Sequence, residues 1–328
     1  MLRVTERFLR YVKVNTTPDP DSETSPSTER QFDLLRMLRD ELIELGAKDV
    51  VLDEYGYVYA KIPATVPNLP TLGFLAHVDT SPDASGEGVN PRIVENYDGG
   101  SILLNAEKNV IMSPAEFPEL SAYAGQDLIV TDGTTLLGAD DKAGVAQIMT
   151  LCERLLSPDA PPHCEIAIAF TPDEEIGRGT KHFDVKRFGA DFAYTMDGGK
   201  LGEIEYENFN AAAAKVTVNG VSIHPGTSKN KMKNAVLIGM EFHSMLPPAE
   251  APAHTEGYEG FFHLTDIEGE VERCVVKYII RDHDKALFEA RKARMRAIEK
   301  YLNEKYGEGT VVVDLSDTYY NMKEKVLP

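Results

Sequence analysis

Short runs of apolar residues, separated by stretches with helical spacing, are the feature that most constrains the fold of this chain. Nearly continuous apolar runs suit strands that are covered on both faces, as in an α/β sheet. Between two of these runs, residues 142–156 place Val145, Ile148 and Cys152 at helical spacing. Strands that alternate with helices predict a largely parallel sheet between helix layers. The runs are TLGFLA (71–76), DLIVTD (127–132), CEIAIAF (164–170) and DFAYTM (191–196).

A different order of elements follows Asn208. It corresponds to β-α-β-β-α-β, which is the split βαβ unit of ferredoxin-like domains. We therefore expect a first domain at 1–208, a second at 209–317, and a start of a return to the first domain at 318–328. The second domain is predicted from strands at 212–220, 260–267, 271–281 and 310–315, and from helices at 234–245 and 285–306.

Charge and cysteine content argue against several classes of protein. Lys and Arg number 34 against 53 Asp and Glu, a net charge of −19 that suits neither nucleic-acid phosphates nor an anionic membrane surface. No apolar run reaches the roughly 18 residues of a membrane span, and the N-terminus lacks the apolar stretch of a signal peptide. The three cysteines form no CxxC pair. We therefore expect a cytoplasmic protein with reduced thiols, and neither a nucleic-acid nor a membrane partner.

Acidic and histidine side chains stand where the predicted strands end. Because ligands of open α/β sheets bind outside the carboxyl ends of the strands, we expect these side chains to meet at one edge. Closely packed carboxylates repel one another, and a divalent cation removes that repulsion. Histidine and carboxylates without cysteine suit Zn²⁺, Mn²⁺ or Co²⁺, and the number of acids predicts two ions. The residues are His77, Asp79, Asp140, Asp141, Glu174, Glu175 and Asp197.

Each residue has a simpler interpretation when it is taken alone. His77 could be a buried histidine held by Asp79, which alternation places on the same face. Asp140 could cap the helix that follows, and Glu174 with Glu175 could charge a helix N-terminus. Asp197, Gly198 and Gly199, which follow the fourth run, could form a plain turn. Four such coincidences at four strand ends are harder to accept than one site, so the joint pattern favours a metal site.

Longer motifs follow one another along the chain: AHVDTSPD, TTLLGADDKAGVA, FTPDEEIGRGTKHFD, MDGG, ENFNAA, HPGTSK, EGYEGFFHL and YIIRD. In order and spacing they resemble the peptidase T family, the tripeptide aminopeptidases of the di-zinc exopeptidase superfamily. That superfamily also contains aminoacylases and succinyl-diaminopimelate desuccinylase. The resemblance implies a zinc-exopeptidase-like α/β/α sandwich with an inserted ferredoxin-like lid. It also implies a metallo-aminopeptidase that releases the N-terminal residue of tripeptides, and it extends to YYNMKEKV near the C-terminus.

The resemblance further implies a ligand set for two zinc ions. His77 and Asp197 would bind one ion, Glu175 would bind the second, and Asp140 would bridge both. The family pattern also implies a cis peptide bond between Asp140 and Asp141.

Other roles follow from the same resemblance. Glu174 would be the general base that takes a proton from the catalytic water, and Asp79 would orient His77. His224 would close onto the site near the developing oxyanion, and Arg281 would hold the terminal carboxylate of the substrate. The simpler interpretations are a turn histidine for His224 and, for Arg281, a surface ion pair with the next residue.

The family pattern continues past Pro328, where it supplies a late histidine for the second zinc ion and a Gly-rich substrate loop. We therefore expect a truncated chain whose second zinc site is incomplete. The leading interpretation is a zinc-dependent tripeptide aminopeptidase that acts on small peptides and forms a homodimer through the lid. The alternatives are another amide hydrolase of the superfamily, a deacylase or dipeptidase, and a catalytically impaired fragment that binds at most one zinc ion.

Overall fold

The structure, a computed structural model, describes residues 3–326 and divides the chain into two compact units, Met1–Leu201 and Gly202–Pro328. This division lies before the boundary expected at residue 208. The expected domain limits, including a separate return segment at 318–328, stay predictions. Their outermost residues lie outside the described range.

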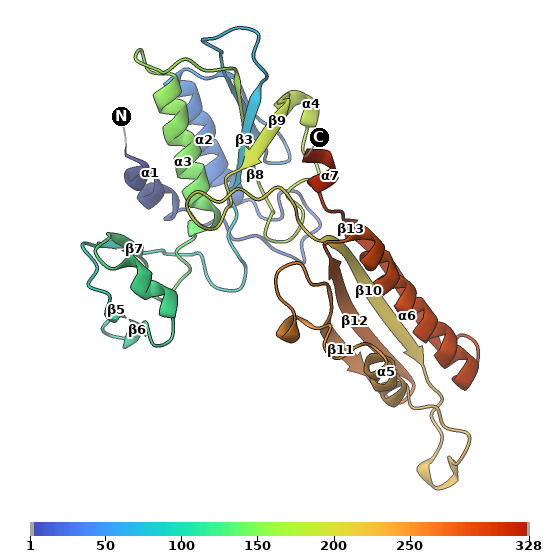
Figure 1. Ribbon diagram of the computed structural model, residues 1–328. Helices are drawn as coiled ribbons and strands as arrows, with labels where there is room; N and C mark the ends of the chain where they lie inside the picture. The colour runs from blue at the N-terminus through green and yellow to red at the C-terminus, as the bar shows by residue number, and fades with distance from the viewer. Residues whose placement is uncertain (1–2, 327–328) are drawn as a thin grey trace. The chain divides into compact units, whose positions relative to one another are not determined.

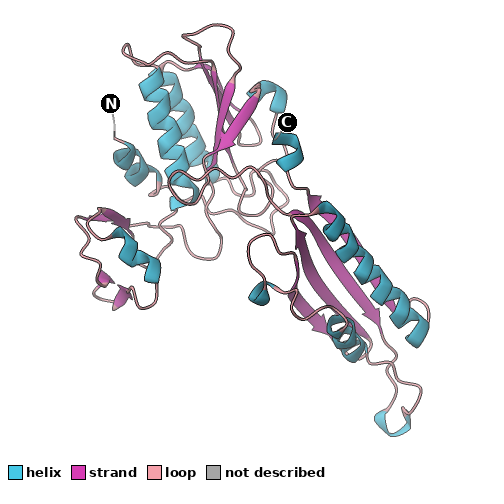
Figure 2. Ribbon diagram, in the orientation of Figure 1, coloured by secondary structure: helices cyan, strands magenta, loops and turns pink. Residues whose placement is uncertain are grey.

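A mixed five-stranded sheet forms the centre of the first unit (Figures 1 and 2). Its order is β1-β2-β8-β3-β9, with β3 parallel to β8 and β9, and with β2 antiparallel to β1 and β8. The expectation of a largely parallel sheet is therefore wrong for the β1–β2 half. The strands are β1 (Lys48–Leu52), β2 (Val58–Ile62), β3 (Leu72–His77), β8 (Ile166–Thr171) and β9 (Phe192–Thr195).

Helices α2 and α3 pack on this sheet and α1 packs on α3, and together they build the main core of the unit (Figure 1). Leu38 of α2 and Met149 of α3 are fully buried there. Gly46 ends α2 in the left-handed conformation, which glycine adopts without strain. A second cluster lies around Phe188 of the short helix α4. The helices span Val4–Tyr11 (α1), Gln31–Leu45 (α2), Ala139–Leu155 (α3) and Val185–Phe188 (α4).

Two of the four predicted sheet strands differ from expectation. The strand β9 is the edge strand, and its Phe192 and Tyr194 are 52% and 43% exposed, so it is not covered on both faces. The run at 127–132 is not in this sheet at all. It supplies β7 to a small insertion between β3 and α3, with its own core around Tyr97 and Leu120. The insertion contains β4 (Arg92–Val94), β5 (Ile102–Asn105), β6 (Val110–Met112), η1 (Pro118–Tyr123) and β7 (Leu128–Val130).

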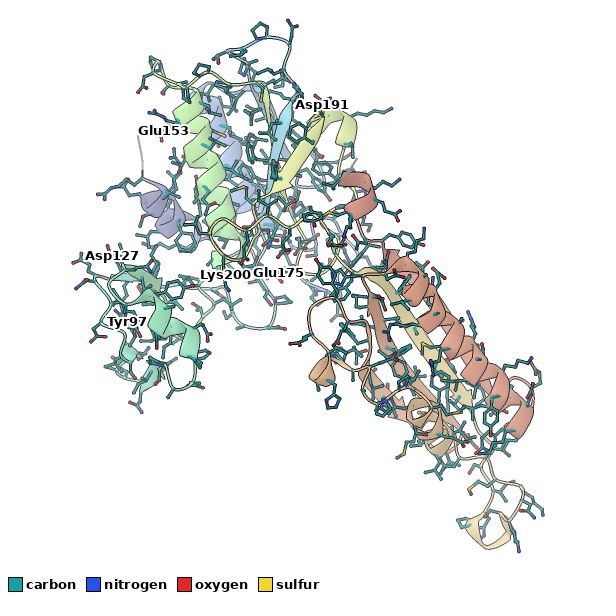
Figure 3. The ribbon with its side chains drawn as sticks, in the orientation of Figure 1. Tyr97, Asp127, Glu153, Glu175, Asp191 and Lys200 are labelled. Atoms are coloured by element: carbon teal, nitrogen blue, oxygen red, sulfur yellow. The ribbon has the colours of Figure 1, made fainter. Side chains whose placement is uncertain are left out.

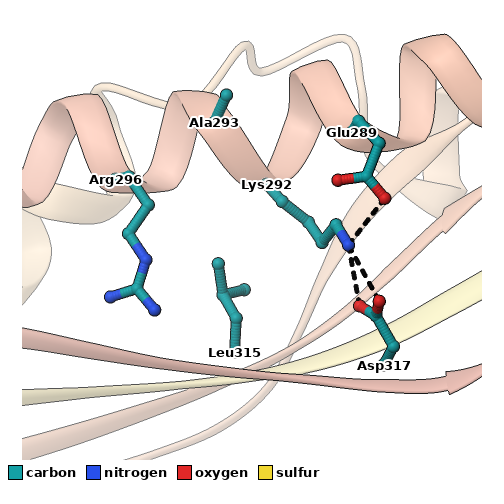
Figure 4. Close-up of a pocket in the computed structure, with 6 residues that line it drawn as sticks. All are labelled: Glu289, Lys292, Ala293, Arg296, Leu315 and Asp317. Carbon is teal, nitrogen blue, oxygen red and sulfur yellow. Dashed lines mark hydrogen bonds and ion pairs between the residues drawn. The ribbon is translucent and has the colours of Figure 1, made fainter.

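The second unit has the predicted β-α-β-β-α-β order, which confirms the ferredoxin-like arrangement. Its antiparallel sheet runs β11-β12-β10-β13, and α5 and α6 share one core with it. A hollow between α6 and β13 is crossed by ion pairs from Lys292 to Glu289 and Asp317 (Figure 4). The elements are β10 (Asn210–Asn219), η2 (Pro225–Thr227), α5 (Ala235–Ser244), η3 (Pro252–His254), β11 (Phe261–Gly269), β12 (Arg273–Asp282), α6 (Lys285–Tyr306), β13 (Val311–Tyr319) and α7 (Lys323–Val326).

Among residues 3–326, no helix is both long enough and apolar enough to cross a lipid bilayer. The three cysteines are free thiols, and two of them, Cys152 and Cys274, are buried.

Candidate metal centre

The candidate site lies at the edge where β3, β8 and β9 end. His77 is the last residue of β3 and pairs in parallel register with Thr171, the last residue of β8. Helix α3 begins near this edge, and Gly144 lets its backbone approach the end of β9. A Cβ atom at Gly144 would lie 2.1 Å from the carbonyl oxygen of Met196, so only glycine permits this contact. The approach brings the start of α3 close to Asp197.

The predicted ligands meet at this edge. The Nε2 atom of His77 lies 2.9 Å from Asp140 Oδ1, 3.7 Å from Asp197 Oδ2 and 4.0 Å from Glu174 Oε2. His77, Asp140 and Glu175 offer ligand atoms that all lie within 4.8 Å of one another. Figure 3 labels Glu175 in this region.

Two of the simpler interpretations are wrong. The backbone angles of Asp140 and Asp141 are non-helical, and within residues 3–326 the Asp140 carboxylate bonds to His77 and to no backbone N–H of α3, so Asp140 does not cap the helix. The segment after β8 is a loop, and the next helix starts only at Val185, so Glu174 and Glu175 do not charge a helix N-terminus.

Asp79 contacts both His77 and the loop after β8 that carries Glu174 and Glu175, which we call the acidic loop. Its carboxylate is fully buried, and Oδ1 lies 3.3 Å from His77 Nδ1. The same carboxylate accepts hydrogen bonds from the backbone N–H groups of Glu174 and Glu175, at 3.0 Å each. His77 Nδ1 also lies 3.0 Å from the backbone oxygen of Asp79. Nε2 of His77 is therefore the ring nitrogen that faces the other carboxylates.

The protonation of these groups shows how strongly their negative charges crowd one another. Burial alone favours the neutral imidazole, but hydrogen bonding and charge from Asp79 raise the pKa of His77 to about 10. Burial raises the pKa of Asp197 to about 6, and the charges of Asp140 and Glu174 add to this shift. Burial also raises the pKa of Glu175, to which the charge of Asp140 contributes. Without a cation the cluster thus holds protons, and one imidazole with several carboxylates is a donor set that fits Zn²⁺, Mn²⁺ or Co²⁺.

A second row of residues lies beneath the cluster; the sequence placed Asp141 at this edge without a separate role and missed Lys142. Asp141 is buried, accepts the backbone N–H of His77 at 3.2 Å, and forms a further candidate ligand group with His77 and Asp197. Burial raises the pKa of Asp141 to about 8. The peptide bond between Asp140 and Asp141 is cis, as the resemblance implied. Lys142 is also buried, and burial lowers its pKa to about 7. The only sequence signal was the Asp-Asp-Lys run itself.

Asp173, directly before the acidic pair, was missed as well. It is almost fully buried and accepts hydrogen bonds from Ser27 N–H at 2.7 Å, Ser27 Oγ at 2.5 Å and Gln31 Nε2 at 2.7 Å. Its own N–H donates to Gln31 Oε1 at 3.1 Å. Asp173 has a φ of 58°, a left-handed conformation that aspartate tolerates better than most residues. These bonds tie the acidic loop to the start of α2.

The two residues predicted to contact substrate, His224 and Arg281, both lie in the second unit. His224 is exposed in a short turn, and its Nδ1 accepts the N–H of Gly226 at 3.2 Å. Arg281 is half-buried on β12. Its simpler interpretation is wrong, because the neighbouring Asp282 is buried and pairs with Arg291 at 2.8 Å.

Comparison with known proteins agrees with these features. A peptidase T from Halothermothrix orenii is 61% identical over 327 residues, which is 99% of this chain and 80% of the relative. A peptidase T from Geobacillus thermodenitrificans is 56% identical over 324 residues, which is 98% of this chain and 79% of the relative. The chain belongs to the peptidase T family. This confirms the resemblance predicted from the sequence, and with it the expectation of a hydrolytic enzyme.

Solved structures and a domain family extend the comparison. An aminopeptidase PepT from Bacillus cereus has a TM-score of 0.74 at 23% identity and covers 98% of this chain and 77% of its own. A Staphylococcus aureus tripeptidase has a TM-score of 0.73 at 22% identity, covering 97% of this chain and 76% of its own. A Bacillus subtilis protein described as a dinuclear metal-binding peptidase of the M20 family has a TM-score of 0.57 at 14% identity. The match covers 97% of this chain and 74% of that protein. These likenesses show that this chain shares their fold. Residues 206–310 match the family described as peptidase dimerisation domain.

Proposed function

We propose that this chain releases the N-terminal residue of tripeptides by zinc-dependent hydrolysis. Membership of the peptidase T family makes it a peptidase. What supports the mechanism above all is one observation, the convergence of His77, Asp140, Glu175 and Asp197 beside Glu174 at one sheet edge.

The metal ligands would be the residues that crowd one another most. His77 and Asp197 would hold one ion, Glu175 the other, and Asp140 would bridge the two. Asp141 is a further donor beside the first ion, since it groups with His77 and Asp197. When bound, zinc lowers the pKa of a water molecule toward about 7 and polarises a carbonyl group.

Glu174 is the proposed general base. Its side chain is 53% exposed and reaches to 4.0 Å from His77 Nε2, while its backbone N–H is held by Asp79. A fixed backbone with an exposed carboxylate would let Glu174 accept a proton from the attacking water and pass it to the leaving amine. A general base of this kind contributes typically 10²–10⁴-fold to the rate.

His224 and Arg281 are the proposed contacts of the second unit to substrate. Because His224 Nδ1 accepts a backbone N–H, its ring proton in the neutral form sits on Nε2 and can be donated to a developing oxyanion. Arg281 offers guanidinium N–H groups that can bind the far carboxylate of a tripeptide in two parallel hydrogen bonds.

The oligomeric state and location are part of the same proposal. The match of residues 206–310 to a dimerisation domain supports a homodimer formed through the second unit. Three free cysteines support a reducing compartment, the cytoplasm.

Hydrolysis of matched substrates tests the activity. The zinc-loaded protein is assayed with free tripeptides, dipeptides and N-acyl amino acids, and Glu174→Gln serves as the inactive reference. Release of the N-terminal residue from tripeptides, at rates well above those on the other two classes, is expected. Preferred cleavage of N-acyl amino acids or of dipeptides would instead establish a deacylase or a dipeptidase.

A further inference from the structure

A pocket of about 420 Å³ on the second unit has no role so far. Its volume lies within the range of sites that bind small molecules. Aromatic side chains dominate its lining, and two glutamates accompany them. Its lining includes Glu205, Glu207, Phe209, Tyr258, His283 and Tyr319.

Three of the rings form one continuous wall. The ring centroid of His283 lies 4.0 Å from that of Phe209 and 4.6 Å from that of Tyr258. Tyr258 is 64% exposed, yet its hydroxyl is anchored because it donates to Glu207 Oε1 at 2.8 Å. A fixed aromatic face that stays open to solvent is typical of a surface that binds another aromatic or apolar group.

A cation with spare donors lies over Tyr319, another ring of the pocket lining. The guanidinium carbon of Arg281 lies 5.2 Å from the ring centroid of Tyr319, which lines the pocket. Arg281 donates to the carbonyl oxygen of Ile280 at 3.1 Å, and no carboxylate of residues 3–326 lies within ion-pair distance of it. Its remaining N–H groups are therefore available to an anion, and a carboxylate matches their planar geometry best.

His283 contributes a second polar group that lacks a hydrogen-bond partner among residues 3–326. Its Nδ1 atom is buried and has no hydrogen-bond partner within the described part of the chain. Buried polar atoms of native proteins are nearly always paired, so a polar group of a ligand or a water would complete this one.

The hollow between α6 and β13 makes a useful contrast (Figure 4). Its cations already have partners, since Lys292 pairs with Glu289 and Asp317, and Arg296 pairs with Glu299. The cations of that hollow are therefore already paired with carboxylates. The aromatic pocket instead combines solvent-exposed rings with an arginine that has no acid partner among the described residues.

We propose that the aromatic pocket binds the C-terminal residue of a peptide, with its carboxylate on Arg281 and an aromatic side chain against Phe209, Tyr258 and His283. This inference rests on the proposed function and adds a preference to it. The glutamate side chain of Glu205 at the pocket disfavours an acidic C-terminal residue. Tripeptides that end in Phe, Tyr or Trp therefore bind more tightly than those that end in Ala, and those that end in Glu bind most weakly.

The absence of tryptophan from the chain allows a direct binding test. Gly-Gly-Trp is titrated into the metal-free protein with a chelator present, and the emission of its indole, the only one in the sample, is followed. A blue shift that saturates is expected, because the indole leaves water. Tyr258→Ala weakens binding about tenfold, since an aromatic pair loses both contact area and ring interaction. Amidation of the peptide weakens binding as well.

Matched variants separate the ring contact from general damage to the fold. Tyr258→Phe keeps the ring, loses the bond to Glu207, and binds within about twofold of the parent. Tyr301→Ala removes a comparably exposed tyrosine from α6 and leaves binding unchanged. Equal binding of Gly-Gly-Trp by the parent and by Tyr258→Ala overturns the proposal. So does equal binding of Gly-Gly-Trp and Gly-Gly-Glu.

Kinetics distinguish failure of the subsite from failure of the proposed function. The zinc-loaded protein is expected to cleave Ala-Ala-Phe with a kcat/KM about tenfold above that for Ala-Ala-Ala. Tyr258→Ala lowers kcat/KM more for Ala-Ala-Phe than for Ala-Ala-Ala. Cleavage of both peptides without preference leaves the aminopeptidase in place and overturns the subsite. Binding of Gly-Gly-Trp that depends on Tyr258 and Arg281, without cleavage of any tripeptide, supports the subsite and overturns the function.

Discussion

The carboxylate of Asp79 accepts the backbone N–H of Glu174 at 3.0 Å, a bond that joins the end of β3 to the loop after β8. The other carboxylate oxygen accepts the N–H of Glu175, also at 3.0 Å, and Oδ1 faces the imidazole of His77 at 3.3 Å. One buried side chain thus sets the positions of a histidine ligand, an acidic ligand and the proposed base. Orientation of a metal-binding histidine by a carboxylate commonly affects both affinity and activity.

Asp79→Asn tests this arrangement. An amide keeps the shape but turns one acceptor into a donor, so one of the two backbone N–H groups loses its partner. We expect zinc affinity or kcat to fall about 10–100-fold. Chelator competition measures the affinity, and Asp83→Asn in the exposed loop nearby is the control. Unchanged affinity together with unchanged kcat would show that Asp79 does not act on the site.

Glu174 and Glu175 are neighbours with different proposed roles, so they form a matched pair. Glu174→Gln should lower kcat by about 10²–10⁴-fold because the water loses its proton acceptor, while the zinc content stays the same. Glu175→Gln should lower the zinc content itself. Metal analysis by mass spectrometry beside a tripeptide assay separates the two effects. Loss of zinc from Glu174→Gln would assign that residue to the metal instead.

Arg281→Ala tests carboxylate recognition. A free tripeptide should show a raised KM, whereas the same peptide with a C-terminal amide should be affected little because it carries no charge for Arg281 to bind. The control is Arg273→Ala, an exposed arginine on the same strand. Equal losses on the free and the amidated peptide would count against the assignment.

Asp173→Ala tests the anchoring of the acidic loop. The substitution leaves Ser27 N–H and the amide of Gln31 without their acceptor, and each unpaired buried donor costs about 1–3 kcal/mol. We expect the free energy of unfolding to fall by about 2–4 kcal/mol in urea titrations. Asp159→Ala at an exposed turn should change it by less than about 0.5 kcal/mol. A stability equal to that of the parent would mean that the network contributes nothing.

Zinc binding should release protons. In the metal-free chain the pKa of His77 is raised to about 10 and that of Asp141 to about 8, so both groups hold protons at pH 7. A bound cation favours their deprotonated forms, so the apparent zinc affinity rises with pH between 6 and 8. Calorimetric titration in two buffers of different ionisation enthalpy counts the protons. Asp141→Asn should release about one proton fewer at pH 7. A proton count of zero would contradict the shifted pKa values.

The same raised pKa values affect stability without metal. The folded chain binds more protons at His77 and Asp141 than the unfolded chain does, so their contribution is full at low pH and is lost as pH rises through about 8 and then about 10. With a chelator present, we expect the melting temperature to fall between pH 7 and pH 9. Excess zinc should reduce or reverse this fall.

Local pattern was enough to predict many elements and the edge at which the acidic side chains meet. Helix α6 begins and ends at the predicted residues, and His77, Asp140, Glu175 and Asp197 meet as strand alternation suggested. These predictions succeeded because apolar periodicity reports which face of an element is buried, and because chain direction places the ends of parallel strands at a common edge.

Prediction from local sequence pattern failed where one apolar run is compatible with more than one strand pairing. The run at 127–132 is apolar enough for the main sheet, yet β7 pairs with β4 in a separate insertion. Apolarity predicts burial but does not name the partner strand. Local pattern does not show that Asp173 and Lys142 are buried and bonded at the site, because their partners, Gln31 and Val14, lie more than a hundred residues away in the chain.

The sequence alone was enough to predict the order of elements in the second unit, the strand ends at which acidic side chains gather, and the family. The tertiary structure alone decided which carboxylate holds which backbone, which aspartate pairs with which arginine, and which rings line a pocket. The physical reason is that periodicity and residue type are properties of neighbouring positions, whereas hydrogen bonds and desolvation depend on residues that only folding brings together.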